Sequence, residues 1–245
     1  MGIFVLSFSG FKLRTTRTEM AEAQTRPDTL AGTPDRWEAA YLRFETPEEE
    51  IRKFMGRLVR LGAGQWPRDA EIVELFCGRG SGLIALQRLG FKRLEGVDLS
   101  PRLIAQYRGP AKCIVADCRK LPFASNCKDV LIVQGGLHHL PDLPADLEQT
   151  FAEMQRVLRK DGCVMFVEPW RTPFLDLIHF VSGIPLIRRL SGKMDAFATM
   201  VENEIPTYKQ WLSQPERIKK IARDHFVPVQ ESTAWGKWSF VGTPR

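Results

Sequence analysis

Short apolar runs alternate with amphipathic segments along most of the chain. The runs with strand character are Glu71–Phe76, Arg93–Asp98, Lys112–Ala116, Asp129–Gln134 and Cys163–Glu168. Segments with helical spacing lie between them, at residues 81–90, 100–109 and 144–162. Strands that alternate with helices predict right-handed crossovers and a parallel sheet. Because these strands are almost continuously apolar, we expect both faces of the sheet to be buried.

A further helix is predicted upstream of the first strand, over residues 46–62. Thr46 and Glu49 have the spacing of a capping box, and Pro47 stands at the first helical position. Gly62 can end the helix. The residues before it are polar or belong to a short apolar stretch, so residues 1–35 are expected to form a disordered extension. The sequence leaves open whether Met1 or Met20 is the true start.

The alternation breaks after the fifth expected strand. Residues 170–213 carry helical pieces separated by prolines and glycines, which predicts a helical cap inserted into the domain. Two strand-like runs then meet at Gly236, which predicts an antiparallel hairpin that closes one edge of the sheet. We therefore expect one α/β domain over residues 36–245, with 170–213 as its cap.

Composition and charge narrow the class of protein. The 245 residues carry a net charge of +6, which favours anionic partners only weakly because the basic residues are scattered. Five cysteines without a C-x-x-C pair argue against a disulfide framework and against a metal site. Reduced thiols and the lack of a secretory signal predict a cytoplasmic protein.

The stretch "EIVELFCGRGSG", residues 71–82, places a glycine cluster directly after a strand. A phosphate-binding loop would need Lys-Ser/Thr after the last glycine, and a dinucleotide-binding turn would need G-x-G-x-x-G; neither is present. Asp98 follows Gly78 by twenty positions, at the end of the next strand, where a carboxylate can accept hydrogen bonds from both ribose hydroxyls. Asp117, at the end of the third strand, is placed to receive the amino group of adenine. The turn therefore suits an adenosine with a free ribose.

Five successive motifs resemble those of the class I S-adenosylmethionine-dependent methyltransferases. They are Glu74 with "CGRGSG", then "GVDLSP", "ADCRKLPF", "DVLIVQGGLHHL" and "LRKDGCVMFVEPW", in the order and at distances similar to those of the family. The resemblance covers residues 36–169 and the closing hairpin, and it is strongest to the small-molecule, methyltransferase type 11-like branch. It implies a Rossmann-like, doubly wound, mostly parallel seven-stranded sheet. It also implies S-adenosyl-L-methionine as cofactor and S-adenosyl-L-homocysteine as product.

The resemblance assigns residues to the cofactor. Glu74 and the glycines of the turn would line its methionine part, Asp98 its ribose, and Gln134 with Gly135 the region of the methyl group. The full set of implied cofactor residues is Glu74, Phe76, Gly78, Gly80, Asp98, Leu99, Asp117, Cys118 (through its backbone), Gln134 and Gly135. Phe76 stands where the family usually has glycine. Either its ring packs beneath the turn, or the cofactor sits slightly differently.

The acceptor is predicted to be a small molecule. The D/N-P-P-Y/F stretch of enzymes that methylate base amino groups is replaced by "QGGLHHL", and no Pro-Cys dipeptide occurs, so nucleic acid is disfavoured. Small-molecule members of the family bind acceptors beneath the insertion and the N-terminal helix. Substrate contacts are therefore expected from Trp37, Tyr41, Trp170, His179 and Tyr208. His138 and Glu168 are the candidates for taking a proton from the acceptor or orienting it, although "LHHL" could simply begin a helix.

Several alternatives stay open at this point. The chain could methylate nucleic acid or protein, or could bind S-adenosylmethionine as a non-catalytic accessory protein. The identity of the acceptor, the atom that is methylated, the need for a base and the oligomeric state are not predicted. Residues 174–190, "FLDLIHFVSGIPLIRRL", predict either ordinary packing of the cap or a peripheral contact with a membrane or a lipid-like acceptor.

Overall fold

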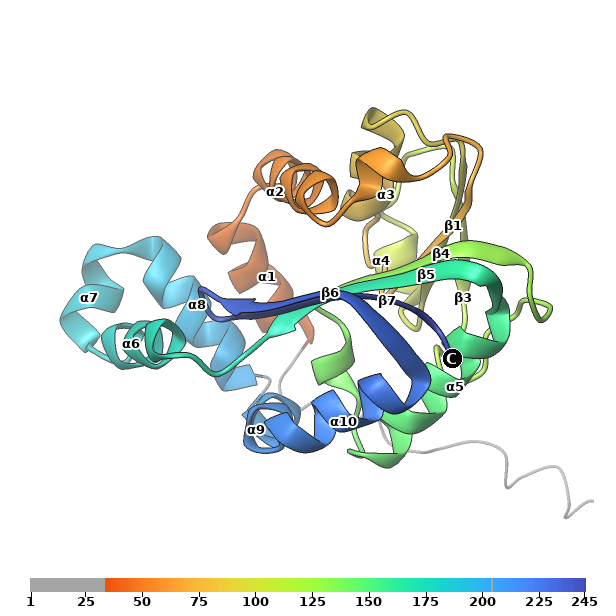
Figure 1. Ribbon diagram of the computed structural model, residues 1–245. Helices are drawn as coiled ribbons and strands as arrows, with labels where there is room; N and C mark the ends of the chain where they lie inside the picture. Colours follow the sequence, from red (N-terminus) through yellow and green to blue (C-terminus); the bar gives the residue numbers. More distant parts are fainter. Residues whose placement is uncertain (1–33, 204) are drawn as a thin grey trace, which may run out of the picture.

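Seven strands form a single sheet in the order β3-β2-β1-β4-β5-β7-β6 (Figure 1). The computed structural model describes residues 34–203 and 205–245. The strands are β1 (Glu71–Leu75), β2 (Arg93–Asp98), β3 (Lys112–Val115), β4 (Lys128–Gln134), β5 (Leu158–Pro169), β6 (Phe226–Ala234) and β7 (Lys237–Pro244). β1 to β5 are parallel, whereas β7 runs antiparallel to β5 and to β6. The predicted α/β fold, its mostly parallel sheet and its antiparallel hairpin are confirmed.

Helices cover both faces of this sheet. On one face, α2 (Pro47–Arg60) and α3 (Ser81–Arg88) pack against the strands, and on the other face α5 (Ala145–Val157) and α10 (Pro215–His225) do so (Figure 1). The capping box of α2 is present, because Thr46 accepts a hydrogen bond from the Glu49 amide and the Glu49 side chain accepts one from the Thr46 amide. The chain order reverses between β1 and β4, the point at which sheets of this kind bind ligands at the carboxyl ends of their strands.

Two expected helices are shorter than the sequence predicts. The predicted helix over residues 144–162 ends at Val157, and the residues from Leu158 onward already belong to β5. The predicted helix over residues 100–109 shrinks to α4 (Pro101–Ile104). The reason for the second difference lies in Tyr107, whose hydroxyl accepts a hydrogen bond of 3.1 Å from the Ala111 amide and so turns the chain back toward β3.

The cap consists of four helices and lies at the carboxyl end of the parallel strands (Figure 1). They are α6 (Pro173–Ser182), α7 (Pro185–Leu190), α8 (Gly192–Asn203) and α9 (Ile205–Ser213). α1 (Pro34–Phe44) packs on α8, where Arg43 pairs with Asp195 at 3.1 Å and the rings of Phe44 and Phe197 lie 6.1 Å apart. The N-terminal helix and the insertion, far apart in sequence, therefore form one layer.

The hairpin reaches the base of this cap. Trp235 and Gly236 both have positive φ, 52° and 72°, as the two central residues of a tight hairpin turn require. The Gly236 amide donates to Thr172 Oγ1 at 3.0 Å, and its carbonyl accepts from the Trp170 amide at 2.9 Å. Of residues 1–35, where we expect a disordered extension, residues 1–33 lie outside the described part of the chain, whereas residues 34 and 35 belong to α1 and correct that expectation. No helix within residues 34–203 and 205–245 is long and apolar enough to cross a bilayer.

Candidate functional site

The glycine cluster forms a tight turn between β1 and α3. Gly78 and Gly80 have φ of 51° and 82°, in the left-handed region that glycine adopts without strain. The ring of Tyr107 lies directly over Gly80, so a Cβ atom added there would come within 2.2 Å of the ring. The sequence has a glycine at this position, but only the folded structure shows the aromatic ring that leaves no room for a Cβ atom.

Phe76 adopts a left-handed backbone conformation, with φ of 56°, that is uncommon for a residue with a bulky side chain. Its ring packs against the turn after β4, where a Cβ atom added to Gly136 would meet Phe76 Cγ at 2.3 Å. Phe76 thus retains the backbone shape that a glycine would give. Its ring contacts the neighbouring turn that follows β4.

Glu74 is the most deeply buried of the implied cofactor residues with an acidic side chain. It is 2% exposed, and its Oε1 accepts a hydrogen bond of 3.4 Å from Gln134 Nε2. Its Oε2 is buried without a hydrogen-bond partner among the described residues. Burial raises the pKa of Glu74 to about 8. Gly82 makes room for this carboxyl group, because a Cβ atom there would lie 1.8 Å from Glu74 Oε1.

Gln134, the last residue of β4, connects Glu74 to a cation that sequence reasoning missed. Arg57 of α2 donates from Nη1 to Gln134 Oε1 at 3.3 Å. Burial lowers the pKa of Arg57 to about 10, although the nearby Glu45 carboxylate opposes this shift. Gly135 follows with φ of 85° and with open space around the position of a Cβ atom. An arginine, an amide and a carboxyl group thus meet where β4 and β1 end.

Asp98 lies at the end of β2, as predicted, and holds two neighbouring segments together. Its carboxylate accepts hydrogen bonds from the Gly78 and Ser100 amides, each of 2.8 Å. A carboxylate has about four lone-pair sites, so this one retains acceptor capacity. The next residue, Leu99, exposes 68% of its surface. Such an exposed apolar side chain beside the ribose candidate is suitable for packing on the face of a purine.

The Asp117 carboxylate is already hydrogen-bonded to Arg119. Its carboxylate receives hydrogen bonds from the Arg119 guanidinium, the shortest of 2.6 Å between Nη2 and Oδ2, and these lower the pKa of Asp117. Arg119 also bonds Asp146 at 2.7 Å. An adenine amino group would therefore share Asp117 with Arg119. Cys118 is buried with its Sγ 3.7 Å from Thr150 Oγ1, and burial raises the pKa of its thiol to about 12.

His138 and Glu168 form a buried pair at the carboxyl ends of β4 and β5. Glu168 Oε2 lies 2.7 Å from His138 Nδ1, and the amides of Gly136 and Leu137 donate to Oε1 at 2.9 and 3.0 Å. Burial acts to raise the pKa of Glu168, but the hydrogen bond and charge of His138 together with the two amides outweigh it, so this pKa is lowered. Because its oxygens are engaged, Glu168 holds the 3-10 helix η2 (Leu137–His139) and the imidazole in place.

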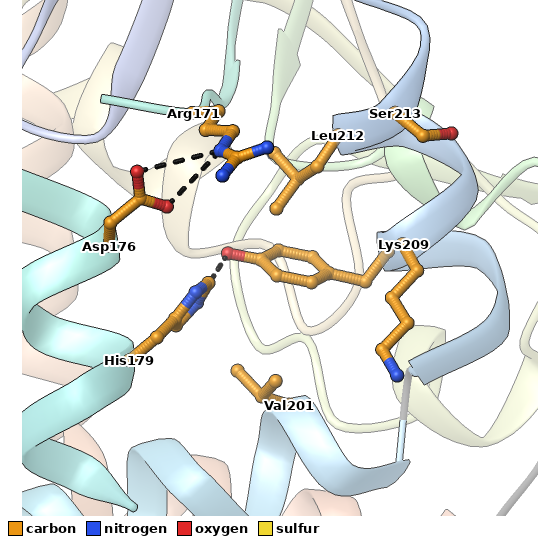
Figure 2. Close-up of a pocket in the computed structure, with 8 residues that line it drawn as sticks. Arg171, Asp176, His179, Val201, Lys209, Leu212 and Ser213 are labelled. Atoms are coloured by element: carbon orange, nitrogen blue, oxygen red, sulfur yellow. Dashed lines mark hydrogen bonds and ion pairs between the residues drawn. The ribbon is translucent and has the colours of Figure 1, made fainter. Parts of the chain in front are cut away.

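A cavity of about 370 Å³ lies within the cap (Figure 2). It is lined by Arg171, Asp176, His179, Val201, Tyr208, Lys209, Leu212 and Ser213. The Tyr208 hydroxyl and His179 Nε2 are 3.2 Å apart, and Arg171 pairs with Asp176 at 3.3 Å. The ring of Tyr208 also meets the ring of His138 edge-on, with centroids 5.9 Å apart. Tyr208 therefore connects this cavity with the buried histidine.

The remaining substrate candidates have different surroundings. Tyr41 of α1 lies beneath the Arg79 guanidinium, 4.8 Å from the ring centroid, and Arg79 belongs to the glycine turn. Trp170 is not brought to this site: it is buried in an aromatic cluster, with ring centroids 4.7 Å from Trp238 and 6.2 Å from Trp211. Trp37 lies in α1, but its side chain is outside the described part of the structure.

Comparison with known proteins finds similarity to methyltransferases in the central part of the chain. A family model described as "Methyltransferase domain" matches residues 73–166. A demethylmenaquinone methyltransferase from Chlorobaculum parvum is 26% identical over 164 residues, which cover 64% of this chain. The match spans 65% of the length of that relative.

Solved structures share the whole architecture at low sequence identity. The PH0226 protein from Pyrococcus horikoshii superposes with a TM-score of 0.65 at 18% identity, over 87% of this chain and all of the other. Magnesium protoporphyrin IX methyltransferase from Synechocystis, with bound SAH, superposes with a TM-score of 0.57 at 15% identity, over 86% of this chain and 94% of the other. These likenesses show the fold.

Proposed function

We propose that this chain is a class I S-adenosylmethionine-dependent methyltransferase that transfers a methyl group from S-adenosylmethionine to a small-molecule acceptor. The observation that supports this most directly is the meeting of Glu74, Asp98 and Gln134 around one glycine turn, at the carboxyl ends of three adjacent strands. Ligands of doubly wound sheets bind at this edge.

The residues around the turn fit the cofactor group by group. The ammonium group of its methionine part would satisfy the buried, unpartnered Oε2 of Glu74, which otherwise costs free energy. The ribose hydroxyls would use the remaining acceptor capacity of Asp98, and the adenine ring would cover the exposed Leu99. Phe76, Gly78 and Gly80 shape the backbone for this approach, and Cys118 offers its backbone beside the adenine.

S-adenosylmethionine would supply an electrophilic sulfonium methyl group, which the acceptor would take in line while the S–CH3 bond breaks and S-adenosylhomocysteine leaves. The chain's part is to align the acceptor and, where it carries a proton, to remove it. We propose that His138 accepts the proton of the acceptor. Because Glu168 lies against Nδ1, the favoured tautomer carries hydrogen on Nδ1 and leaves Nε2 with a lone pair. Glu168 is then a positioning residue, in the manner of the carboxylate that orients a catalytic histidine.

The acceptor is proposed to occupy the cap cavity, with Tyr41, His179 and Tyr208 among its contacts. A volume of about 370 Å³ falls within the range of small-molecule sites, about 300–1,000 Å³. One relative in sequence is named for a menaquinone precursor and one neighbour in structure for a porphyrin, which supports testing acceptors with an extended ring first. Tyr208, between the cavity and His138, would bring the acceptor beside the methyl group.

The cofactor assignment is tested by calorimetry with S-adenosylhomocysteine. The wild-type chain is expected to bind it, and Asp98→Asn to bind about 10- to 100-fold more weakly, since hydrogen bonds to a charged acceptor contribute about 1.5–3 kcal/mol. Asp161→Asn, an exposed aspartate near the start of β5, is the control. If Asp98→Asn binds S-adenosylhomocysteine as tightly as the wild type does, Asp98 does not hold the ribose. If the wild type does not bind it, the cofactor assignment is wrong.

Catalysis is tested separately from binding. The chain is incubated with S-adenosylmethionine and a set of reduced hydroxynaphthoquinones, phenols and amines, and release of S-adenosylhomocysteine is measured. Release that depends on the acceptor is the expected result. Tight cofactor binding without release for any acceptor would instead favour a non-catalytic accessory protein.

A further inference from the structure

Large apolar side chains are exposed on the outer side of the cap and on the tip of the hairpin. Six of them have between 41% and 77% of their surface in solvent. They are Phe174, Leu177 and Phe180 on α6, Leu186 and Leu190 on α7, and Trp235 in the turn between β6 and β7. We call this set the apolar cap surface. Contiguous exposed apolar patches of this kind are rare on monomeric soluble proteins and mark interaction sites.

The helix α6 turns its larger apolar side chains away from the core. Phe174, Leu177 and Phe180 recur every third residue, so they share one side of the helix. On the side that meets the rest of the protein, Leu175 and Ser182 are buried. Packing among the described residues therefore leaves Phe174, Leu177 and Phe180 exposed.

The surface is continuous from α6 to the hairpin. The rings of Phe174 and Trp235 meet edge-on with centroids 5.3 Å apart. Leu175 packs against Gly236, where an added Cβ atom would lie 3.3 Å from the leucine side chain. Thr172 Oγ1 accepts a hydrogen bond from the Gly236 amide at 3.0 Å. The hairpin tip and the start of α6 are thus held together as one face.

One exposed arginine borders this face. Of the three arginines in residues 170–191, Arg171 and Arg188 are held in ion pairs with Asp176 and Asp195, whereas Arg189 is exposed. A face with phenylalanine, tryptophan and leucine, bordered by a basic residue, has the composition of segments that lie in the interface of a bilayer. The positive charge of Arg189 complements anionic lipid headgroups.

We propose that the apolar cap surface seats this protein on a bilayer that contains anionic lipids. Phe180, Leu190 and Trp235 enter the boundary between headgroups and acyl chains, and Arg189 meets the headgroups. α6 also lines the cap cavity, through Asp176 and His179. An acceptor dissolved in the bilayer would thus reach the cavity from the same side, a consequence that rests on the proposed methyl transfer.

The docking itself is tested without cofactor or acceptor, by sedimentation of the full chain with lipid vesicles. The wild-type chain is expected to bind vesicles of phosphatidylcholine with phosphatidylglycerol more tightly than vesicles of phosphatidylcholine alone. Phe180→Ser with Trp235→Ser should weaken this binding about tenfold or more, because each removes a large apolar group from the lipid contact. Val59→Ser with Val229→Ser, two exposed apolar positions on α2 and β6, is the matched control and should bind as the wild type does.

The charge component has its own variant. Arg189→Glu should weaken binding to the anionic vesicles and leave the weak binding to neutral vesicles unchanged. All variants are exposed at the altered positions, so circular dichroism and melting temperature should match the wild type. Equal vesicle binding by the wild type and the Phe180/Trp235 variant would overturn the proposal. The proposal would also be overturned if the wild type does not bind vesicles but forms a dimer, and if the Phe180/Trp235 variant is a monomer. The surface would then bind a second copy of the chain. Failure of methyl transfer would leave the sedimentation result unaffected.

Discussion

The carboxyl edge of the sheet and the helical cap bury their side chains to different degrees. Nearly every residue of β4 and of the second half of β5 is buried, and helices pack on both faces of these strands. In the cap, α6 buries only Leu175 and Ser182, and α7 buries no residue. The sheet can therefore hold polar groups such as Glu74 and Glu168 in fixed positions, whereas the cap is a thin layer with apolar side chains on its outside.

The two regions are also held together by different contacts. Around the sheet edge, buried hydrogen bonds connect β1, β4, β5 and α2 through Gln134 and Glu168. The cap depends on Trp211, whose indole is fully buried and donates to the Pro169 carbonyl at 2.8 Å, and on Arg188, which pairs with Asp195 at 3.1 Å and Glu202 at 2.5 Å. Exposed pairs of this kind contribute little stability. The contrast teaches that polar groups at the sheet edge are held by buried contacts, whereas the outer helices of the cap, α6 and α7, are held by few.

The largest expected effect lies at the rigid edge and concerns the reaction rate. His138→Asn should lower the rate of methyl transfer about 100- to 10,000-fold, since general-base assistance is typically of this size. The asparagine amide can still donate to Glu168, so cofactor affinity and melting temperature should change little. Single-turnover kinetics with a known acceptor measures the rate. A wild-type rate would mean that the reaction proceeds by alignment alone.

Glu168→Gln separates a positioning role from a catalytic one. Glutamine cannot hold the imidazole tautomer as a carboxylate does, so the pH dependence of the rate should shift while cofactor binding persists. A profile identical to that of the wild type would contradict the role assigned to Glu168.

The next largest effect concerns how the cap is attached. Trp211→Ala should lower the free energy of unfolding by about 3–5 kcal/mol, because a fully buried tryptophan leaves a cavity. Leu186→Ala, at an exposed position of the same cap, should change it by about 0.5 kcal/mol or less. Urea titration measures both. Similar values for the two variants would show that the cap has no single buried attachment.

A smaller effect tests the ring over the glycine turn. Gly80→Ala should cost about 1–2 kcal/mol for the left-handed backbone, and more because of the clash with Tyr107. Gly135→Ala has the same kind of backbone but open space, so only the backbone cost is expected. Tyr107→Ala should reduce the penalty of the Gly80 variant toward that of the Gly135 variant in thermal melts. If Gly80→Ala and Gly135→Ala lower the melting temperature equally, and Tyr107→Ala does not alter the effect of Gly80→Ala, the clash is excluded.

The last effect is a dependence of stability on pH, which is small for each step of pH. The pKa of Glu74 is about 8 when folded and near 4.5 in the unfolded chain, so between these values the folded protein keeps a proton that the unfolded chain has lost. Raising the pH through this window should therefore lower the free energy of unfolding, by at most about 1.4 kcal/mol per pH unit. Glu74→Gln removes this contribution. A wild-type slope that the variant leaves unchanged would place the titrating group elsewhere.

Much of the sheet could be predicted because its information is local. Apolar runs specified β1 to β4 to within one residue, and Thr46 with Glu49 specified the start of α2, since strand burial and capping depend on neighbours in sequence. The start of β5 was missed, because residues 158–162 have the spacing of the preceding helix. The family resemblance then implied roles for Glu74 and Asp98. Arg57 was missed because its partner Gln134 lies far along the chain, and so was the hydrogen bond from Arg119 to Asp146.

By itself, the sequence determined the order of strands and helices, the glycine turn with its acidic neighbours, and the existence of the cap and hairpin. These depend on the period of apolar residues and on backbone preferences, which act over a few positions. Only the tertiary structure decided that Glu168 holds His138, that the ring of Phe76 needs Gly136, that Trp170 belongs to the core, and that α1 packs on α8. The same holds for the outward apolar face of α6, because a hydrophobic periodicity specifies one side of a helix but not whether that side meets the core or the solvent.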